Sequence, residues 1–556
     1  MSGQRKSKKS SHRGRPRRTI RKKRSNVQTT SRFFQPSHVF LNGNVLTMDP
    51  THPVAEAIAI LDDKIVATGT SETIANLAGP STRVTDLQGA TVLPGFIDCH
   101  NHLIWHGITL GHINLHEVHS IPEMKRLVAE RADGSDKWIH GDGWDQEKFT
   151  EKRYPTKHDL DDVSPNNPVL LRRVCGHICV VNSAALKAAD VTTQTLDPAG
   201  GIIDRDAAGE PTGILREKAV ELVELVLPHL PGEDFERATL AASEIALRAG
   251  ITSVHCITSS QSELRALLNL KAAGKLKLRF YVFIPADQMK IAQQAGIRSG
   301  LGDEWVRIGG VKIFTDGSLG ARTAALHEPY ADDTRNRGVT IYNQEELDKL
   351  VHEAHSSDFQ IAAHAIGDRA VGMALSAFEK AQSQIPKKEL RHRIEHASVL
   401  NPELIKRFAA SGIIASIQPH FIVSDFWTEQ RLGTARALFA YPFSSLLRAG
   451  IRTVAGSDCP FDLLPPLAGT AAAVDRPGSS EAVSVEMAIA FYSRDAAYAS
   501  FEENVKGTIS PGKYADLVIL DEDPRKVLPS RIPDMRVLMT VVGGRVAYYS
   551  DARFMP

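Results

Sequence analysis

Between about residue 95 and residue 500, short apolar segments of strand composition alternate with Ala- and Leu-rich amphipathic segments. GITSVHC, LRFYVFI and IIASIQP are typical of the first kind, and EDFERATLAASEIALRAG is typical of the second. Strands and helices in alternation predict a parallel sheet covered by helices. At this length a closed (β/α)8 TIM barrel is favoured over an open doubly wound sheet. No Gly-rich dinucleotide-binding or Walker loop follows any strand-like segment, so no nucleotide cofactor is expected.

Strand-like segments also lie near both ends of the chain. VFLNGNVLTMD precedes the alternating region, and ADLVILDEDP and VLMTVVGGRVAYY follow it, the last with Gly543-Gly544 as a predicted hairpin turn. Because short strands at either end cannot build a core separately, we expect one β domain assembled from residues 38–94 and 505–548. The barrel then spans residues 95–504. Within it, residues 105–235 fit the alternation poorly and are expected to form an insertion over one end of the barrel.

The charges are unevenly distributed along the chain. Residues 1–26 hold twelve of the 66 Lys and Arg residues and none of the 65 Asp and Glu residues. This N-terminal segment contains too few apolar residues to offset the entropy that a chain loses when it becomes ordered. We therefore expect residues 1–37 to form a disordered basic tail. Its contacts with nucleic acid or other polyanions through residues 1–26 would be nonspecific and salt-sensitive.

The rest of the composition points to a cytoplasmic protein. No segment approaches the roughly 18 apolar residues that cross a bilayer, and the N-terminal region lacks the apolar core of a signal peptide, so no membrane contact is expected. Five cysteines in 556 residues, with no framework spacing, are expected to be reduced thiols. A small-molecule substrate is expected, and the sequence is compatible with a homodimer.

Metal-ligand residues occur where several strand-like segments end, which in a barrel is the face that carries active sites. Residues two apart on a strand point the same way, so His100 and His102 can hold one ion. Later segments end in His364, His396 and Asp458. Each alone would more often be a hydrogen-bonded core residue, but four imidazoles and a carboxylate together predict a divalent metal site. The ligand set favours Zn, and Mn, Fe or Ni fit the same chemistry.

These motifs resemble those of the metal-dependent amidohydrolase superfamily over residues 38–548. The superfamily motifs are Pro94-Gly95-Phe96-Ile97-Asp98-Cys99-His100-Asn101-His102, Gly456-Ser457-Asp458 and Gly507-Thr508-Ile509. The amidohydrolase family 3 branch, which includes N-substituted formamide deformylase-like proteins, is similar at Gly143-Trp144-Asp145, Gly176-His177 and Asp316-Gly317-Ser318-Leu319-Gly320. The resemblance implies that the β domain is a sandwich built from both termini.

The resemblance also implies a sixth ligand, Lys312, in VRIGGVKIFTDG. In dinuclear relatives this lysine is carboxylated and bridges two ions. His100, His102, Lys312 and Asp458 would then surround one ion, and Lys312, His364 and His396 the other. If Lys312 is an ordinary ion-paired lysine, a single ion held by His100, His102, His364 and Asp458 is expected.

The expected function is hydrolysis of a carbon–nitrogen bond other than a peptide bond, in an amide, an N-substituted formamide or a cyclic amide, by attack of a metal-bound hydroxide. Asp458 is the expected proton shuttle. His177 is either a donor to the substrate carbonyl or a structural histidine. By family position alone, four further residues are expected to line the pocket: Trp144, Asp145, Asp316 and Arg322.

Two alternatives remain open at this point. The same hydroxide could attack C–O or P–O centres, as in a lactonase or a phosphotriesterase. The basic tail suggests a protein of another class, a nucleic-acid-associated binding protein with a relic barrel. The complete ligand set argues against that second alternative.

Overall fold

A computed structural model of the chain describes residues 35–550, apart from residues 229, 390 and 477–479. The expected basic tail therefore lies outside the described residues as far as residue 34. No helix in this described part is long and apolar enough to cross a lipid bilayer.

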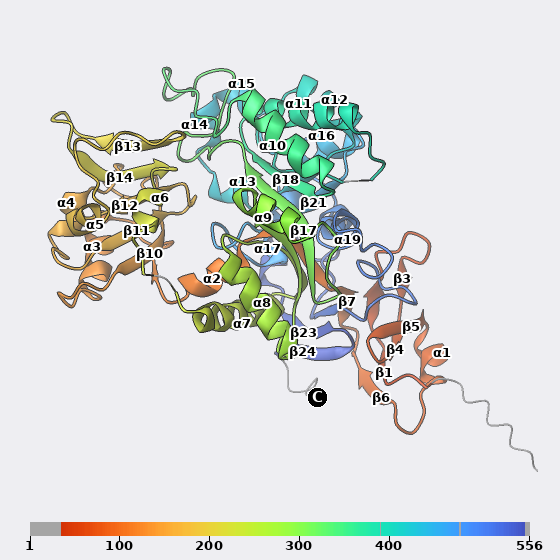
Figure 1. The fold of residues 1–556 in the computed structure, drawn as a ribbon. Helices are drawn as coiled ribbons and strands as arrows, with labels where there is room; N and C mark the ends of the chain where they lie inside the picture. The colour runs from red at the N-terminus through yellow and green to blue at the C-terminus, as the bar shows by residue number, and fades with distance from the viewer. Residues whose placement is uncertain (1–34, 229, 390, 477–479, 551–556) are drawn as a thin grey trace, which may run out of the picture.

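The centre of the fold is an eight-stranded sheet in which every hydrogen-bonded pair is parallel (Figure 1). The predicted α/β barrel class is confirmed. Its strands, in spatial order, are β8 (Phe96–Asn101), β15 (Ile251–Ile257), β16 (Arg279–Pro285), β17 (Val306–Phe314), β18 (Gln360–Ala365), β19 (Arg393–His396), β20 (Ile414–Ile417) and β21 (Thr453–Ala455). Two hydrogen bonds between the end of β8 and the segment after β21 nearly close the barrel: the Asp458 N–H donates to the His100 carbonyl over 2.7 Å, and the His102 N–H to the Cys459 carbonyl over 2.8 Å.

Helices surround this sheet, and their ends follow ordinary capping chemistry. The main ones are α7 (Gly232–Arg248), α8 (Gln261–Ala272), α10 (Gln344–Ser356), α11 (Asp368–Gln384), α12 (Pro402–Ser411) and α16 (Phe443–Arg448). The side chain of Asn343 caps α10 by accepting from the Glu346 N–H, and the Glu346 carboxylate accepts in turn from the Asn343 N–H. Helix α12 starts with Pro402 and ends at Gly412, whose φ of +67° favours glycine. Their buried faces share one apolar cluster with the barrel strands, including Val254, Val311 and Ile361.

Between β8 and β15 the chain forms a separate sheet beside the barrel (Figure 1). Its strands, in spatial order, are β13 (Gly201–Arg205), β14 (Pro211–Glu217), β12 (Ile178–Val181), β11 (Val169–Arg173), β10 (Ile139–Trp144) and β9 (Ile113–Asn114). Helices α3 (Ile121–Ala129), α4 (Lys157–Asp161), α5 (Ser183–Ala188) and α6 (Glu221–Glu224) accompany it. Two apolar clusters of its own hold this segment together, one around Trp144 and Leu171 and the other around Val181 and Leu215.

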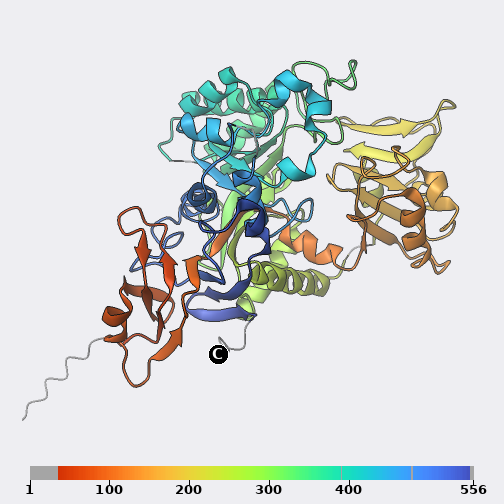
Figure 2. The ribbon, with the colours of Figure 1, turned by 180° about the vertical axis from the view of Figure 1, so that it is seen from behind.

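Strands from the two ends of the chain meet in one sheet on the opposite side of the barrel (Figure 2). Its order is β24 (Arg545–Tyr549), β23 (Val537–Val542), β22 (Leu517–Leu520), β7 (Thr91–Pro94), β2 (Asn44–Leu46) and β3 (Val54–Ala55). A second, four-stranded sheet comprises β5 (Lys64–Gly69), β4 (Ala57–Leu61), β1 (His38–Leu41) and β6 (Arg83–Asp86). Both sheets bury side chains in a common cluster that includes Phe40, Ile58 and Ile519. The division of the chain into domains at residues 94 and 504 stays a prediction.

Candidate metal centre

A cavity of about 830 Å³ lies where the barrel strands end, and the inserted sheet supplies part of its wall. All six residues expected to hold metal line it: His100, His102, Lys312, His364, His396 and Asp458. His100 lies on β8, Lys312 on β17, His364 on β18 and His396 on β19, while Asp458 follows β21. The topology thus brings residues more than 350 positions apart to one end of the barrel.

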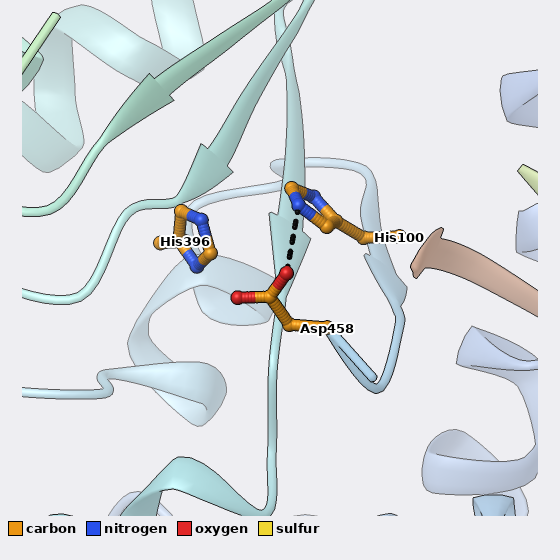
Figure 3. A group of neighbouring side chains, drawn as sticks. All are labelled: His100, His396 and Asp458. Atoms are coloured by element: carbon orange, nitrogen blue, oxygen red, sulfur yellow. Dashed lines mark ion pairs between the residues drawn. The ribbon is translucent and has the colours of Figure 1, made fainter. Parts of the chain in front are cut away.

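Three of these side chains form a compact group. Ligand atoms of His100, His396 and Asp458 all lie within 4.8 Å of one another, and all three residues are buried. Figure 3 shows the Asp458 carboxylate between the two imidazole rings. Its Oδ1 lies 3.3 Å from His100 Nε2, and the ring centroids of His100 and His396 are 4.9 Å apart. The group contains His396, which the single-ion alternative had left out.

The other three expected ligands lie around this group. His102 Nε2 is 3.5 Å from Asp458 Oδ1, and Lys312 Nζ is 3.1 Å from His100 Nε2. The His364 ring lies 4.5 Å from that of His396, centroid to centroid. Its Nε2 faces away from the group, 3.1 Å from the Gly317 carbonyl oxygen.

A buried pair of charges behind the metal centre fixes the orientation of His100. Glu395 accepts a short hydrogen bond from His100 Nδ1, and Arg393 Nη2 donates to the same carboxylate over 2.8 Å. Burial alone would raise the pKa of Glu395, but the Arg393 guanidinium and His100 hold it well below its usual range. An ionised carboxylate only accepts hydrogen bonds, so Nδ1 carries a proton and Nε2 is the ring nitrogen that a cation could reach.

Sequence reasoning missed both Glu395 and Arg393. The signal was present in RIEHAS, where two charged residues alternate with an apolar one on a strand predicted to be buried. Charged side chains in such a strand need partners, and here those partners are each other and His100.

Burial favours the neutral form of His102 and His396. Desolvation lowers the pKa of His102 to about 4 and places that of His396 well below its ordinary value. Burial also lowers the pKa of Lys312 to about 8. Neutral imidazoles offer lone pairs to a cation, and Lys312 has an appreciable neutral amine fraction near pH 7 to 8.

Two buried atoms of the centre lack hydrogen-bond partners within the described part of the chain. They are His396 Nδ1 and Asp458 Oδ1. Buried polar atoms without a partner are costly, and Asp458 Oδ1 lies 3.3 Å from His100 Nε2. A divalent cation would satisfy these atoms together, so the residues fit the metal expected from the sequence.

The inserted sheet brings a second histidine pair to the cavity. His177 Nδ1 lies 2.7 Å from Oε2 of Glu217, which ends β14, and the His177 ring is 5.4 Å from that of His364. Burial lowers the pKa of His177, but the Glu217 carboxylate outweighs this and raises it to about 9. His177 is therefore an imidazolium, a hydrogen-bond donor, at neutral pH. Glu217 was not predicted, because nothing in the local sequence links it to His177.

Two of the four residues expected in the pocket by family position line it. Asp145 pairs with Arg173 over 2.7 Å, and Asp316 accepts backbone N–H groups of Ala325, Ile366 and Gly367 over 2.8 to 3.0 Å. Asp316 thereby joins the loops after β17 and β18.

The other two, Trp144 and Arg322, do not line the cavity. The Trp144 indole packs in the core of the inserted sheet and donates to the Leu171 carbonyl over 2.8 Å, because successive residues of an extended chain point to opposite faces. The Arg322 guanidinium pairs instead with Asp332 over 2.8 Å.

Comparison with known proteins gives consistent results. A family model described as Amidohydrolase family matches residues 83–548. YtcJ of Bacillus subtilis (strain 168), whose name assigns it to the amidohydrolases, is 36% identical over 530 residues, covering 92% of this chain and 99% of its own. N-substituted formamide deformylase of Arthrobacter pascens is 29% identical over 540 residues, covering 92% and 98%. The crystal structure of an uncharacterized metal-dependent hydrolase from Pyrococcus furiosus has a TM-score of 0.72 at 32% identity, covering 88% of this chain and all of the other.

Proposed function

The chain belongs to the amidohydrolase family and is a hydrolase of carbon–nitrogen bonds, and we propose that it cleaves non-peptide bonds in small amides, N-substituted formamides or cyclic amides. The observation that carries this proposal is the compact group of His100, His396 and Asp458, with two unsatisfied buried atoms, in the wall of a large cavity. The relative named N-substituted formamide deformylase supports the choice of substrate class.

We infer that zinc occupies the centre, because imidazole nitrogens and a carboxylate oxygen are ligands that suit it. A bound divalent ion lowers the pKa of water and polarises a carbonyl. His100 and His102 would hold it from β8, His396 from β19 and Asp458 from the segment after β21.

Asp458 has the position of a proton shuttle. Burial would raise its pKa, but His100 and its neighbours hold it well below the usual value, so it is an ionised acceptor. It would take the proton of the attacking water and deliver it to the leaving nitrogen. His177, protonated beside Glu217, would donate a hydrogen bond to the substrate carbonyl oxygen as negative charge develops there.

The number of metal ions in the centre depends on whether Lys312 is carboxylated. Its amine, fully buried and 3.1 Å from His100 Nε2, can add to CO2 when neutral, forming an N–C bond and releasing one proton. The resulting carbamate would offer one oxygen to each of two ions. If Lys312 carries this carbamate, Lys312→Ala should lose one ion per chain, and formate or acetate with excess metal should restore part of the turnover. Unchanged metal stoichiometry would support the single-ion centre.

The test of the function is a substrate panel with the metal-loaded enzyme. Amides, N-substituted formamides and cyclic amides should be hydrolysed, and His100→Ala should lose both metal and turnover, whereas the surface variant His52→Ala should keep both. Activity confined to lactones or phosphotriesters would contradict the substrate proposal. Metal-free protein that binds nucleic acid and hydrolyses nothing would indicate a relic barrel.

A further inference from the structure

Arg173 has one nitrogen without a partner in the wall of the cavity. It ends β11, and its guanidinium is fully buried. Nε donates to Gln146 Oε1 and Nη2 to Asp145 Oδ1, each over 2.7 Å. By hydrogen-bond geometry, Nη1 has no acceptor among the residues described, although the Cys175 thiol, a weak acceptor, lies close enough to the guanidinium to contribute to its electrostatics. Two of the three nitrogens therefore fix the side chain, and the third has no oxygen acceptor in the described part of the chain.

Trp427 has a free donor in the same wall. Its side chain is only 5% exposed, and within the described chain Nε1 has no acceptor either. The Arg431 guanidinium lies 5.0 Å from the centre of the indole and is itself paired with Glu147 and Asp332. A paired guanidinium thus lies over the indole, which forms part of the cavity wall.

Gly320 packs against both side chains. A Cβ placed on Gly320 would lie 2.8 Å from Arg173 Nη1 and 2.9 Å from Cζ2 of Trp427, the indole carbon two bonds from Nε1. The φ of Gly320 is not positive, so the backbone does not require glycine here. Glycine instead lets both side chains lie close to this backbone, in the wall of a cavity that all three residues line.

The charges around this position favour a neutral ligand. Asp145 already compensates the Arg173 charge at 2.7 Å, and the Asp425 carboxyl, which also lines the cavity, interacts electrostatically with both. A further carboxylate would be repelled by Asp145, and also by Asp425 above the pKa of about 7 to which burial raises that carboxyl. A carbonyl oxygen can accept from both donors without that repulsion.

We propose that Arg173 Nη1 and Trp427 Nε1, the unpaired donors of two side chains that pack against Gly320 in the cavity wall, form a subsite for a neutral carbonyl oxygen of the substrate, separate from the scissile bond. This Gly320 subsite would favour substrates with a second amide, urea or ketone group. The assignment of the ligand as a substrate group rests on the proposed hydrolase function. A site that hydrogen-bonds such a group discriminates against analogues without it, because its donors are then left unpaired.

The kinetic test uses N-formyl ω-aminoalkanamides of increasing chain length, which carry a carboxamide at the far end. Two series of equal length serve for comparison: N-alkylformamides, which lack that group, and N-formyl ω-amino acids, which carry a carboxylate there. The wild type should prefer the carboxamide in kcat/KM by about tenfold or more at the best length. Trp427→Phe keeps an aromatic ring and removes the N–H with the pyrrole part of the indole, so it should lower this preference several-fold. The matched variant Trp305→Phe, outside the cavity, should retain it. Equal preference in Trp427→Phe and wild type, or a preference for the carboxylate, would overturn the subsite.

A binding test separates this proposal from the proposed function. The chain has five tryptophans, so ¹⁵N-labelled indoles give a simple spectrum in which Trp427→Phe assigns one signal. N-methylacetamide should shift the Trp427 indole proton downfield in the wild type and leave it unmoved in Gly320→Ala, and acetate should have little effect. A shift without any amide hydrolysis would refute the function and keep the subsite. Hydrolysis with neither shift nor preference would refute the subsite alone.

Discussion

At the scale of single residues, the pair Glu395 and His100 lies at the base of the metal centre. Glu395→Gln keeps the shape but removes the charge that holds the His100 proton on Nδ1. We expect metal affinity to fall about 10- to 100-fold. Chelator competition would measure this, with Glu503→Gln, which alters a partly exposed pair with Arg391, as the control. Equal affinities in the two variants would contradict the role of Glu395.

Asp458→Asn tests the proton shuttle. The amide retains the size of the side chain and loses the ability to accept a proton, so kcat should fall by roughly 10² to 10⁴. Steady-state kinetics at saturating metal would show this, with the metal content measured in parallel. A loss below about tenfold, with metal retained, would exclude Asp458 as the shuttle.

The pH dependence of activity tests His177. Its folded pKa of about 9 lies above the ordinary value of 6.5, so the ion pair with Glu217 is complete below pH 6.5 and is lost as the pH rises through about 9. If His177 donates to the carbonyl, kcat/KM should fall along a limb near pH 9, and His177→Gln should lower the plateau and remove the limb. An unchanged limb in His177→Gln would assign it to another group.

At the scale of secondary structure, strand β17 depends on a glycine where it pairs with β18. A Cβ on Gly310 would lie 2.0 Å from the Gln360 carbonyl oxygen of β18, a backbone atom that cannot move aside. Gly310→Ala should therefore lower the free energy of unfolding by about 1–3 kcal/mol. Gly232→Ala, where a Cβ meets no atom within 4 Å, is the matched control and should be neutral or stabilising. Thermal or denaturant unfolding of the two variants would compare them.

The elements show what local sequence can predict. The Gly543-Gly544 turn was predicted, and both residues have positive φ in a hairpin that pairs Val542 with Arg545. The ends of strands that carry His100, His364 and His396 were also visible in the pattern of apolar runs. The role of Glu395 was not visible, because its partner His100 lies 295 residues away in the sequence and no local pattern encodes that contact. Trp144 was misplaced for a similar reason: a motif gives a position in sequence, whereas the packing of the inserted sheet decides which face it occupies.

At the scale of the whole molecule, the basic tail and the enzyme are expected to act independently. Deleting residues 1–26 removes twelve positive charges and none of the residues of the cavity. We expect kcat/KM to change less than about twofold, while salt-sensitive binding to polyanions weakens strongly. Turnover and nucleic-acid binding at two salt concentrations would measure both. Lost turnover in the shortened chain would contradict the separation.

The six-stranded sheet that joins the two ends of the chain has a consequence for synthesis on the ribosome. Strand β7 pairs with β22 and continues through Gly95 directly into β8, which carries His100. The neighbours that complete this region, β21 and β22, are the last parts of their sheets to be translated apart from the final hairpin. Until about residue 520 has emerged, the nascent chain therefore keeps an open β edge and an unclosed barrel. Premature termination in this gene would leave that edge free to pair with other chains, so incomplete products should aggregate rather than form a smaller working enzyme.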